Sequence, residues 1–233
     1  MHRLCASFCA ALLLGCASTP APSAGRAAAW GYVRLVPREG VAAITSGGGH
    51  SYGDREIADA EFVDYSKPGF AVVYADGAAP AAGRARVAIH AGVSAPGFEP
   101  PYAALGVGGS ITVANESDAP HVVSCPGARL VRPLAPGESL EIRTDRPGEW
   151  EVFLLDAAGA EARVFAAPGP FEVVSSAGRF ALADLAPGPT RIHAWHPRFP
   201  AAAVAVDLAA GQSTRVDLEL RVDRREGEPV HAP

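Results

Sequence analysis

The chain has 233 residues, 48% of them hydrophobic, which is enough to build one large domain or two modest domains around a hydrophobic core. Its formal net charge of −5 at pH 7 is spread along the chain without a basic stripe, and this argues against nucleic acid as a partner. The 25 glycines and 21 prolines fall at intervals throughout and interrupt every candidate helical stretch.

The first residues have the pattern of an export signal. A mostly apolar run covers residues 4–14 and is too short to span a bilayer as a helix. The run closes on Gly15 and Cys16, and a small residue followed by a cysteine at this place resembles the bacterial lipobox. The resemblance implies cleavage before Cys16 and a diacylglycerol on its thiol, so we expect a lipid-anchored protein of the cell envelope. Ala17 rather than Asp after the cysteine favours the outer membrane, facing the periplasm or the exterior.

The cysteines agree with this interpretation. Cys5 and Cys9 lie within the expected signal and Cys16 carries the lipid, so Cys125 is left as a thiol and no internal disulfide can form. An ordinary signal peptide that happens to contain cysteines is the alternative. For the terminal segments we expect a signal peptide at 1–15, a lipidated tether at 16–29 and a disordered tail at 223–233.

Between the tether and the tail, short runs rich in β-branched and aromatic residues alternate with turn residues. Such spacing is typical of sandwiches, and we predict an all-β fold of two β-sandwich domains in tandem. The sequence Ala-Pro-Gly-Pro at 167–170 resists both strand and helix, so we expect a first sandwich at 30–167 and a second at 168–222. The runs lie at 30–36, 70–75, 85–91, 110–114, 121–125, 139–143, 150–155, 163–166, 171–175, 179–182, 190–195, 202–208 and 213–220.

The first domain carries a strand–loop–strand pattern. A candidate strand ends in Asn115, a short loop follows, and a His-Val-Val strand begins at His121. Pro-Gly turns at 136–137 and 147–148 precede the later strands. This order resembles the cupredoxin (plastocyanin) family, and the resemblance implies a β-sandwich in which His121 stands at the position of the first copper ligand.

The other copper ligands that the resemblance implies are missing. A blue-copper centre needs two imidazoles and one thiolate, with a weak axial thioether. In the family the last three ligands follow the strand that here ends near Phe153, and their positions hold Leu154, Ala157 and Ala160. We therefore expect no metal and no cofactor, with His121 as the vestige of a lost site.

Cys125 is a further candidate donor. It follows His121 by four residues, which on a regular strand puts both side chains on one face about 13 Å apart. A buried structural thiol is the simpler interpretation, and a sharp turn before Pro126 would leave a non-standard metal site open.

The second domain has two turn signals. Gly178 permits a tight hairpin, Phe180 and Leu182 alternate and are expected to face inward, and a Pro-Gly turn follows at 187–188. The pattern Gly-x-Phe-x-Leu…Leu-x-Pro-Gly resembles the carboxypeptidase-regulatory-like (transthyretin-like) family, although Thr190 stands where that family often has Tyr. The resemblance implies a packing or recognition module without chemistry of its own.

The remaining histidines and tyrosines give no clear site. His50 and His90 have no partner visible in the sequence. His193 and His196 are expected on opposite faces of a strand, with His196 in the packing. Tyr65 and Tyr74 could line a binding surface, and we prefer a role in the core.

No catalytic motif is found. The glycine loop at 47–49 lacks the Lys and the Ser or Thr of a phosphate-binding loop, and no nucleophile elbow occurs. The sequence therefore favours a non-enzymatic binding or scaffold lipoprotein that recognises an envelope protein, a glycan or another envelope component through exposed loops. One alternative is a periplasmic copper-binding or electron-transfer protein, which the fold resemblance favours and the missing ligands oppose. The other is an accessory subunit that docks onto a catalytic partner.

Overall fold

The computed structural model describes residues 19–37, 64–78, 80–92, 95–174 and 176–222, and these residues form seventeen strands and one 3-10 turn. The expected all-β class is confirmed. The segments predicted as signal peptide and tail, Cys16, the glycine loop at 47–49 and His50 lie outside the described residues. Within the described part of the chain, no helix is long and apolar enough to cross a membrane.

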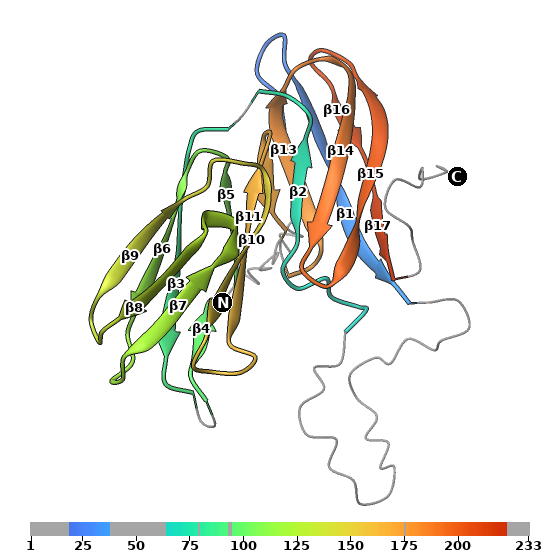
Figure 1. Cartoon of the computed structure of the whole chain (residues 1–233). Coiled ribbons are helices and arrows are strands. Elements are labelled where there is room, and N and C mark those ends of the chain that lie inside the picture. The colour runs from blue at the N-terminus through green and yellow to red at the C-terminus, as the bar shows by residue number, and fades with distance from the viewer. Residues whose placement is uncertain (1–18, 38–63, 79, 93–94, 175, 223–233) are drawn as a thin grey trace, which may run out of the picture.

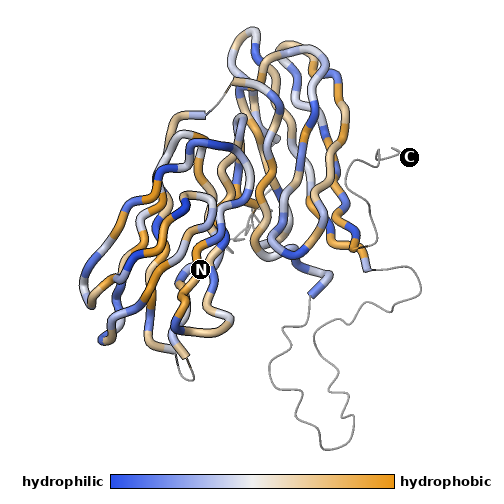
Figure 2. Tube along the Cα trace, in the orientation of Figure 1, coloured by the Kyte–Doolittle hydropathy of each residue, from blue (hydrophilic) through white to orange (hydrophobic). Residues whose placement is uncertain are grey.

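Residues 84–167 form a sandwich of two facing sheets (Figure 1). We call it the inserted sandwich, because it lies in the chain between two strands of the other sandwich. Strands with alternating burial build it: Trp150, Val152 and Leu154 on β10 enter the core, while the residues between them do not. Figure 2 shows the matching alternation of hydrophobic and hydrophilic residues along the strands. One sheet has the order β4 (Gly97–Glu99), β3 (Arg84–His90), β6 (Ser110–Asn115), β9 (Ser139–Arg143); the other has the order β5 (Tyr102–Gly106), β11 (Glu161–Ala167), β10 (Gly148–Leu154), β7 (His121–Cys125), β8 (Leu130–Leu134), with the 3-10 turn η1 (Pro126–Ala128) between β7 and β8.

The C-terminal sandwich also has two sheets. Phe180 and Leu182 are buried in its core, which confirms the expected inward alternation. Gly178 supplies the positive φ of the turn before β13, but the predicted hairpin does not form there, because β12 pairs with β2 and β13 pairs with β1 in the other sheet. One sheet has the order β13 (Arg179–Leu185), β1 (Ala27–Val36), β16 (Ser213–Arg215), with β17 (Leu218–Arg221) also paired to β1; the other has the order β12 (Phe171–Val173), β2 (Val72–Ala75), β14 (Gly188–His196), β15 (Phe199–Leu208).

The two sandwiches do not follow one another in tandem as the sequence suggested. Strand β2 and most of strand β1 fall within the expected first domain at 30–167, yet both pair with strands of the C-terminal sandwich. The stretch from β3 to β11 is therefore an insertion between β2 and β12, and residues 168–222 supply only part of their own domain. Strands β1 and β2 complete its two sheets, because β13, β16 and β17 pair with β1, and β12 and β14 pair with β2.

Strand β1 occupies the centre of its sheet. It runs antiparallel to β13 and parallel to β16 and β17. Its first residues, Ala27 to Ala29, are fully buried, so the last part of the expected tether at 16–29 is strand instead. Gly31 permits the close approach of the segment after β16, because a Cβ there would stand 1.9 Å from the carbonyl oxygen of Val216.

A cluster of aromatic rings joins the two sandwiches. Phe165 on β11 stacks on Trp195 of β14 with 4.8 Å between ring centroids, and Tyr74 on β2 packs against Phe165 at 5.4 Å. Arg163 adds a polar link, because its Nη1 donates to the carbonyl oxygen of Pro197 at 2.8 Å. The C-terminal sandwich thereby covers β5 and β11 on the outer face of the five-stranded sheet.

Candidate functional site

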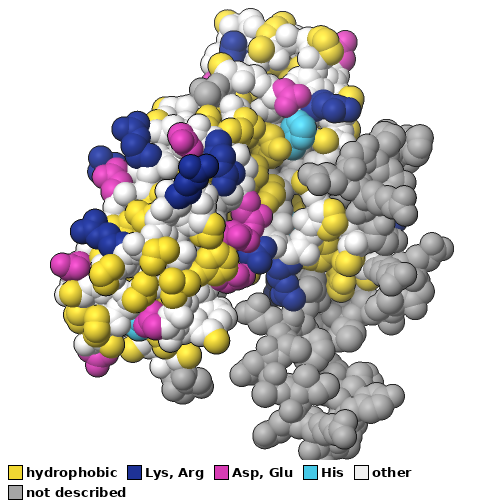
Figure 3. Space-filling model, viewed as in Figure 1, with side chains coloured by type: hydrophobic (Ala, Val, Ile, Leu, Met, Phe, Trp, Pro, Cys, Tyr) yellow, Lys and Arg dark blue, Asp and Glu magenta, His cyan; other side chains and the backbone are white. Residues whose placement is uncertain are grey.

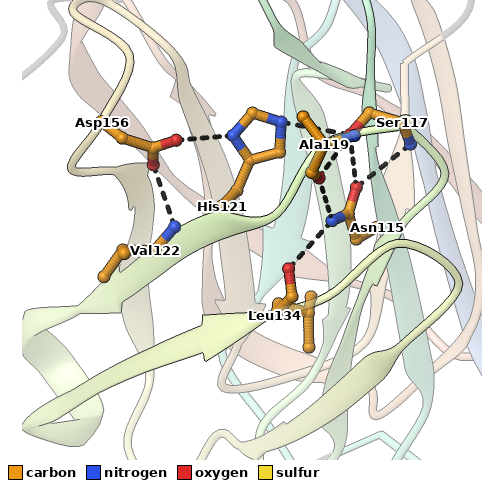
Figure 4. Close-up of polar contacts among 7 residues, drawn as sticks. All are labelled: Asn115, Ser117, Ala119, His121, Val122, Leu134 and Asp156. Carbon is orange, nitrogen blue, oxygen red and sulfur yellow. Dashed lines mark hydrogen bonds and ion pairs between the residues drawn. The ribbon is translucent and has the colours of Figure 1, made fainter.

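The site that the sequence singled out lies where β6 ends and β7 begins. Asn115, the last residue of β6, is 1% exposed and fixes the loop that leads to His121. Its Nδ2 donates to the carbonyl oxygens of Ala119 and Leu134 at 2.8 and 2.9 Å, and its Oδ1 accepts the backbone N–H of Ser117 at 3.1 Å. A single amide side chain thus ties the loop to β8, as Figure 4 shows.

His121 is buried, with 6% of its surface exposed, and both of its ring nitrogens have partners. Nδ1 donates to Oδ2 of Asp156 at 2.7 Å, since a carboxylate can only accept, and Nε2 lies 3.1 Å from the Ser117 hydroxyl. Asp156 also accepts the backbone N–H of Val122 on Oδ1 at 2.9 Å. The Asp156 carboxylate therefore links the His121 imidazole to the backbone of β7, the strand that carries His121.

The pKa of Asp156 reflects these contacts. Partial burial raises the pKa of this carboxyl, and the hydrogen bonds from the Val122 N–H and the His121 ring outweigh that effect, so its pKa lies below the ordinary value. Asp156 is therefore ionised at neutral pH and acts as a permanent acceptor for the His121 ring.

The chain Ser117–His121–Asp156 has the distances of a nucleophilic triad, and its serine borders an open groove that Glu116 and Glu138 also line. The serine oxygen is nevertheless surrounded: Oδ1 of Asn115 lies 2.7 Å away, and the carbonyl oxygen and N–H of Ala119 lie at 3.1 and 3.4 Å. With the residue only 9% exposed, this hydroxyl presents little free surface to a substrate carbonyl. We interpret the network as structural.

The positions at which the cupredoxin pattern places the other copper ligands hold core residues. Leu154 is buried in the core of the inserted sandwich, and so are Ala157 and Ala160. Cys125 lies in the same core at the far end of β7, as expected for a buried structural thiol, and burial raises the pKa of its thiol. Among the described residues, no group of three or more His, Cys, Asp or Glu side chains is arranged to hold a metal ion.

The two histidines of β14 have different surroundings. His193 stacks on Tyr74 at 4.7 Å and its Nε2 lies 2.9 Å from Oδ1 of Asp76. His196 is buried, where its Nε2 donates to the carbonyl oxygen of Pro68 at 3.0 Å. The register of β14 shifts between Ala194 and His196, so the simple alternation assumed from the sequence does not extend to its end.

The remaining candidates take part in contacts within the fold. Tyr65 packs edge-on against Phe199 at 6.1 Å, and Tyr74 is part of the aromatic cluster, so both serve packing as we preferred. His90 on β3 lies 3.5 Å from a carboxylate oxygen of Glu116, close to the groove beside Ser117.

Sequence reasoning found His121 and Asn115 but missed their partners Ser117 and Asp156. One signal was present in the sequence: Asp156 is the charged residue inside the loop from Leu154 to Ala160, where the family pattern calls for metal ligands.

Comparisons with known proteins give a limited result. No protein-family model matches the chain, and no curated protein matches it by sequence. Among solved structures, the chain is similar to a purple cupredoxin from Nitrosopumilus maritimus, with 20% identity over 36% of this chain and 99% of that one, at a TM-score of 0.31. It is also similar to a mutant of amicyanin in the Cu(I) form, with 15% identity over 40% of this chain and 97% of that one, at a TM-score of 0.30. A copper nitrite reductase from Nitrosomonas europaea matches with 17% identity over 37% of this chain and 42% of that one, also at 0.30. With TM-scores this low, the likeness by itself establishes neither the family nor copper binding.

Proposed function

We propose that this chain is a non-enzymatic binding or scaffold protein of the bacterial cell envelope, anchored by a lipid on Cys16. The observation that carries the proposal is the closed network at His121. Both ring nitrogens are engaged by Asp156 and Ser117, and the loop that would complete a copper centre contributes buried apolar side chains. Because its candidate copper ligand, His121, is hydrogen-bonded in this way, the inserted sandwich serves as a rigid scaffold that presents binding surfaces rather than as a redox centre.

In this proposal the C-terminal sandwich, of the carboxypeptidase-regulatory-like type, is the second part of the scaffold. The stacked rings of Phe165 and Trp195 and the bond from Arg163 to Pro197 hold it against the inserted sandwich. The anchor would attach just before β1, so the C-terminal sandwich would lie nearest the membrane, and the partner would be an envelope protein or glycan.

The copper-binding alternative has a direct test. An intense blue band requires a thiolate ligand, and Cys125 is buried in the core away from the loop of Asp156. The purified protein with added Cu(II) should show no such band, and His121→Ala should not abolish any metal-dependent rise in thermal stability. A bound metal stabilises by RT ln(1 + [L]/Kd), about 2.7 kcal/mol at a hundredfold excess over Kd, and a shift of that size that His121→Ala removes would reinstate the copper alternative.

The binding proposal is tested by capture from detergent-solubilised membranes with the full chain, compared with Cys16→Ser. The lipidated protein should fractionate with membranes and retain a defined envelope component, whereas the Cys16→Ser chain should lack the stable membrane association. Unchanged membrane association of Cys16→Ser would contradict the anchor. Capture of a catalytic subunit would favour the accessory role instead.

A further inference from the structure

The C-terminal sandwich has one outer face that lies away from the inserted sandwich. Its sheet with β2 and β14 packs on the inserted sandwich through Tyr74 and Trp195, and Figures 1 and 3 show the two sandwiches in contact. The sheet with β1 lies across the core from that contact, and from Trp30 to Val36 its outward residues on β1 are exposed or half-exposed. We call the following six residues the basic face: Trp30, Tyr32, Arg34, Arg179, Arg215 and Arg221.

The strand register puts these side chains on one surface. On β1, Trp30, Tyr32 and Arg34 point away from the core, because the residues between them are buried. Across the strands, Arg179 of β13 is opposite Tyr32, and Arg215 of β16 is opposite Trp30. The last residue of β17 also lies on this side, since it follows a buried leucine and is exposed. Directly opposed side chains on neighbouring strands are about 5 Å apart, so the basic face is contiguous.

An arginine held over two aromatic rings forms the centre of the basic face. The Cζ atom of Arg215 lies 5.5 Å from the ring centroid of Trp30 and 5.9 Å from that of Tyr32. Asp217 fixes this arrangement, because its Oδ2 accepts Nη2 of Arg215 at 2.9 Å and its Oδ1 accepts the N–H of Tyr32 at 3.1 Å. Tryptophan and tyrosine, with an apolar body and a polar tip, are the residues enriched where proteins meet the membrane–water interface.

The charge of the basic face is opposite to that of the whole chain. Two carboxylates share this surface with the four arginines, and each is paired with one of them: Asp217 with Arg215 and Glu219 with Arg221. The surface therefore carries +2, whereas the whole chain carries −5, which leaves −7 for the rest of the chain. An anionic membrane attracts the basic face and repels the remainder, so it orients the molecule with this face toward the bilayer.

The proposed lipid on Cys16 would keep the bilayer close to this sandwich. The chain is fixed from Ser23 onward, because the Ser23 N–H donates to Oδ1 of Asp184 at 2.9 Å and Nε of Arg26 donates to the carbonyl oxygen of Asp184 at 3.0 Å. Cys16 lies seven positions before Ser23, and a chain of that length spans at most about 25 Å. The bilayer therefore stays near the start of β1, and the inserted sandwich occupies the other side of the C-terminal sandwich.

We propose that the basic face is the surface on which the protein lies against a bilayer that contains anionic phospholipids. Trp30 and Tyr32 sit at the level of the headgroups, and the arginines around them bind lipid phosphates. The proposal rests on the lipid anchor of the proposed function and adds which side of the molecule meets the membrane. The inserted sandwich then points away from the bilayer, where its loops are free to meet a partner.

Trp30 is a built-in reporter of this contact. The chain has three tryptophans, and Trp150 and Trp195 are buried, with 1% and 8% of their surface exposed. The experiment uses the chain without residues 1–16, which retains all described strands, and vesicles of phosphatidylcholine with or without phosphatidylglycerol. With phosphatidylglycerol, the Trp30 emission should shift to the blue and brominated phospholipids should quench it. Both effects should be lost in Trp30→Phe, with phosphatidylcholine alone and at high salt.

Two charge variants locate the contact on the molecule. Arg34→Glu should lower the vesicle partition coefficient roughly tenfold or more, because each positive charge near an anionic surface contributes about a factor of five. Arg143→Glu is the matched control, since Arg143 is an exposed arginine on β9 of the inserted sandwich, and this variant should bind as the parent chain does. Circular dichroism shows that each variant is folded.

Four results overturn the proposal. They are a Trp30 spectrum that vesicles leave unchanged, binding that does not depend on phosphatidylglycerol, an equal loss in Arg34→Glu and Arg143→Glu, and a dimer that Arg34→Glu dissociates, which would assign the face to a second copy. The anchor is decided separately by the membrane association of Cys16→Ser. If the lipidated full chain enters the same vesicles and brominated lipids do not quench Trp30, the anchor stands and the basic face is refuted.

Discussion

The buried imidazole of His196 makes the C-terminal sandwich sensitive to acid. Its Nε2–H donates to Pro68, and its Nδ1 accepts the backbone N–H of Arg198 at 3.0 Å, so the two contacts fit the neutral ring. Protonation of the ring would add a hydrogen to Nδ1, and this hydrogen would point at the N–H of Arg198. Desolvation by burial is the main reason that the pKa of His196 falls to about 4, and the positive charge of Arg198 lowers it further, while the bond to Pro68 acts in the opposite direction.

The size and direction of the effect follow from this pKa. Below the unfolded-state pKa of 6.5 the unfolded chain takes up a proton that the folded protein does not, so the free energy of unfolding falls as the pH drops from 6.5 to about 4 and this contribution then levels off. At 1.36 kcal/mol per pKa unit, the loss between about pH 7.5 and about pH 4.5 is about 2.5 kcal/mol. Carboxylates such as Asp184 also titrate in acid, so the prediction concerns a difference between two proteins.

The comparison is between the wild type and His196→Gln, each unfolded with urea across this pH range. Glutamine cannot take up the proton, so the gap in unfolding free energy between the two proteins should narrow by about 2.5 kcal/mol at the acid end. His90→Gln, which removes an imidazole that is 45% exposed, controls for the loss of a histidine as such. A gap that stays constant from neutral to acid pH would refute the reasoning.

Three further results are expected. Asn115→Ala should lower the free energy of unfolding by about 2 to 4 kcal/mol, since two carbonyls and an N–H lose their partner, and a loss below about 1 kcal/mol would show that water replaces the amide. A fluorophosphonate probe should not label Ser117, because its hydroxyl is surrounded by polar groups; labelling that Ser117→Ala abolishes would make the network catalytic. A fragment of residues 168–222 should be unfolded by circular dichroism. A fragment of residues 80–167, which contains the whole inserted sandwich, should fold alone, because the strands of that sandwich pair among themselves. A folded 168–222 fragment would contradict the assignment of β1 and β2.

Local features of the sequence were sufficient for the strand class and the inward residues. Gly and Pro punctuation excluded helices, and the alternation around Phe180 gave its burial correctly. The domain arrangement could not be predicted from local features of the sequence. The pairing of β1 with β13 and β16 joins segments far apart in the chain and leaves no local signal. A run such as Ala27–Val36 fits any sandwich equally well, and only the partner decides its domain.

The candidate site could be predicted only in part, because local patterns show some of its residues and not others. His121 and Asn115 lie on consecutive strands, so a local pattern identified them. Asp156 approaches His121 across 35 residues through the turn after β10, and only the pairing of β10 with β7 brings the two together.

The central place of β1 also sets the order in which the protein can fold. The bond from the N–H of Tyr32 to Asp217 joins residues 185 positions apart, so β1 waits for its last partners until the segment around Asp217 is available for folding. During that time the inserted sandwich can already form, while the apolar face and both edges of β1 stay open to mispairing. The first of the described strands in chain order is thus completed last, and a factor that shields unpaired strands would be needed most at residues 27–36.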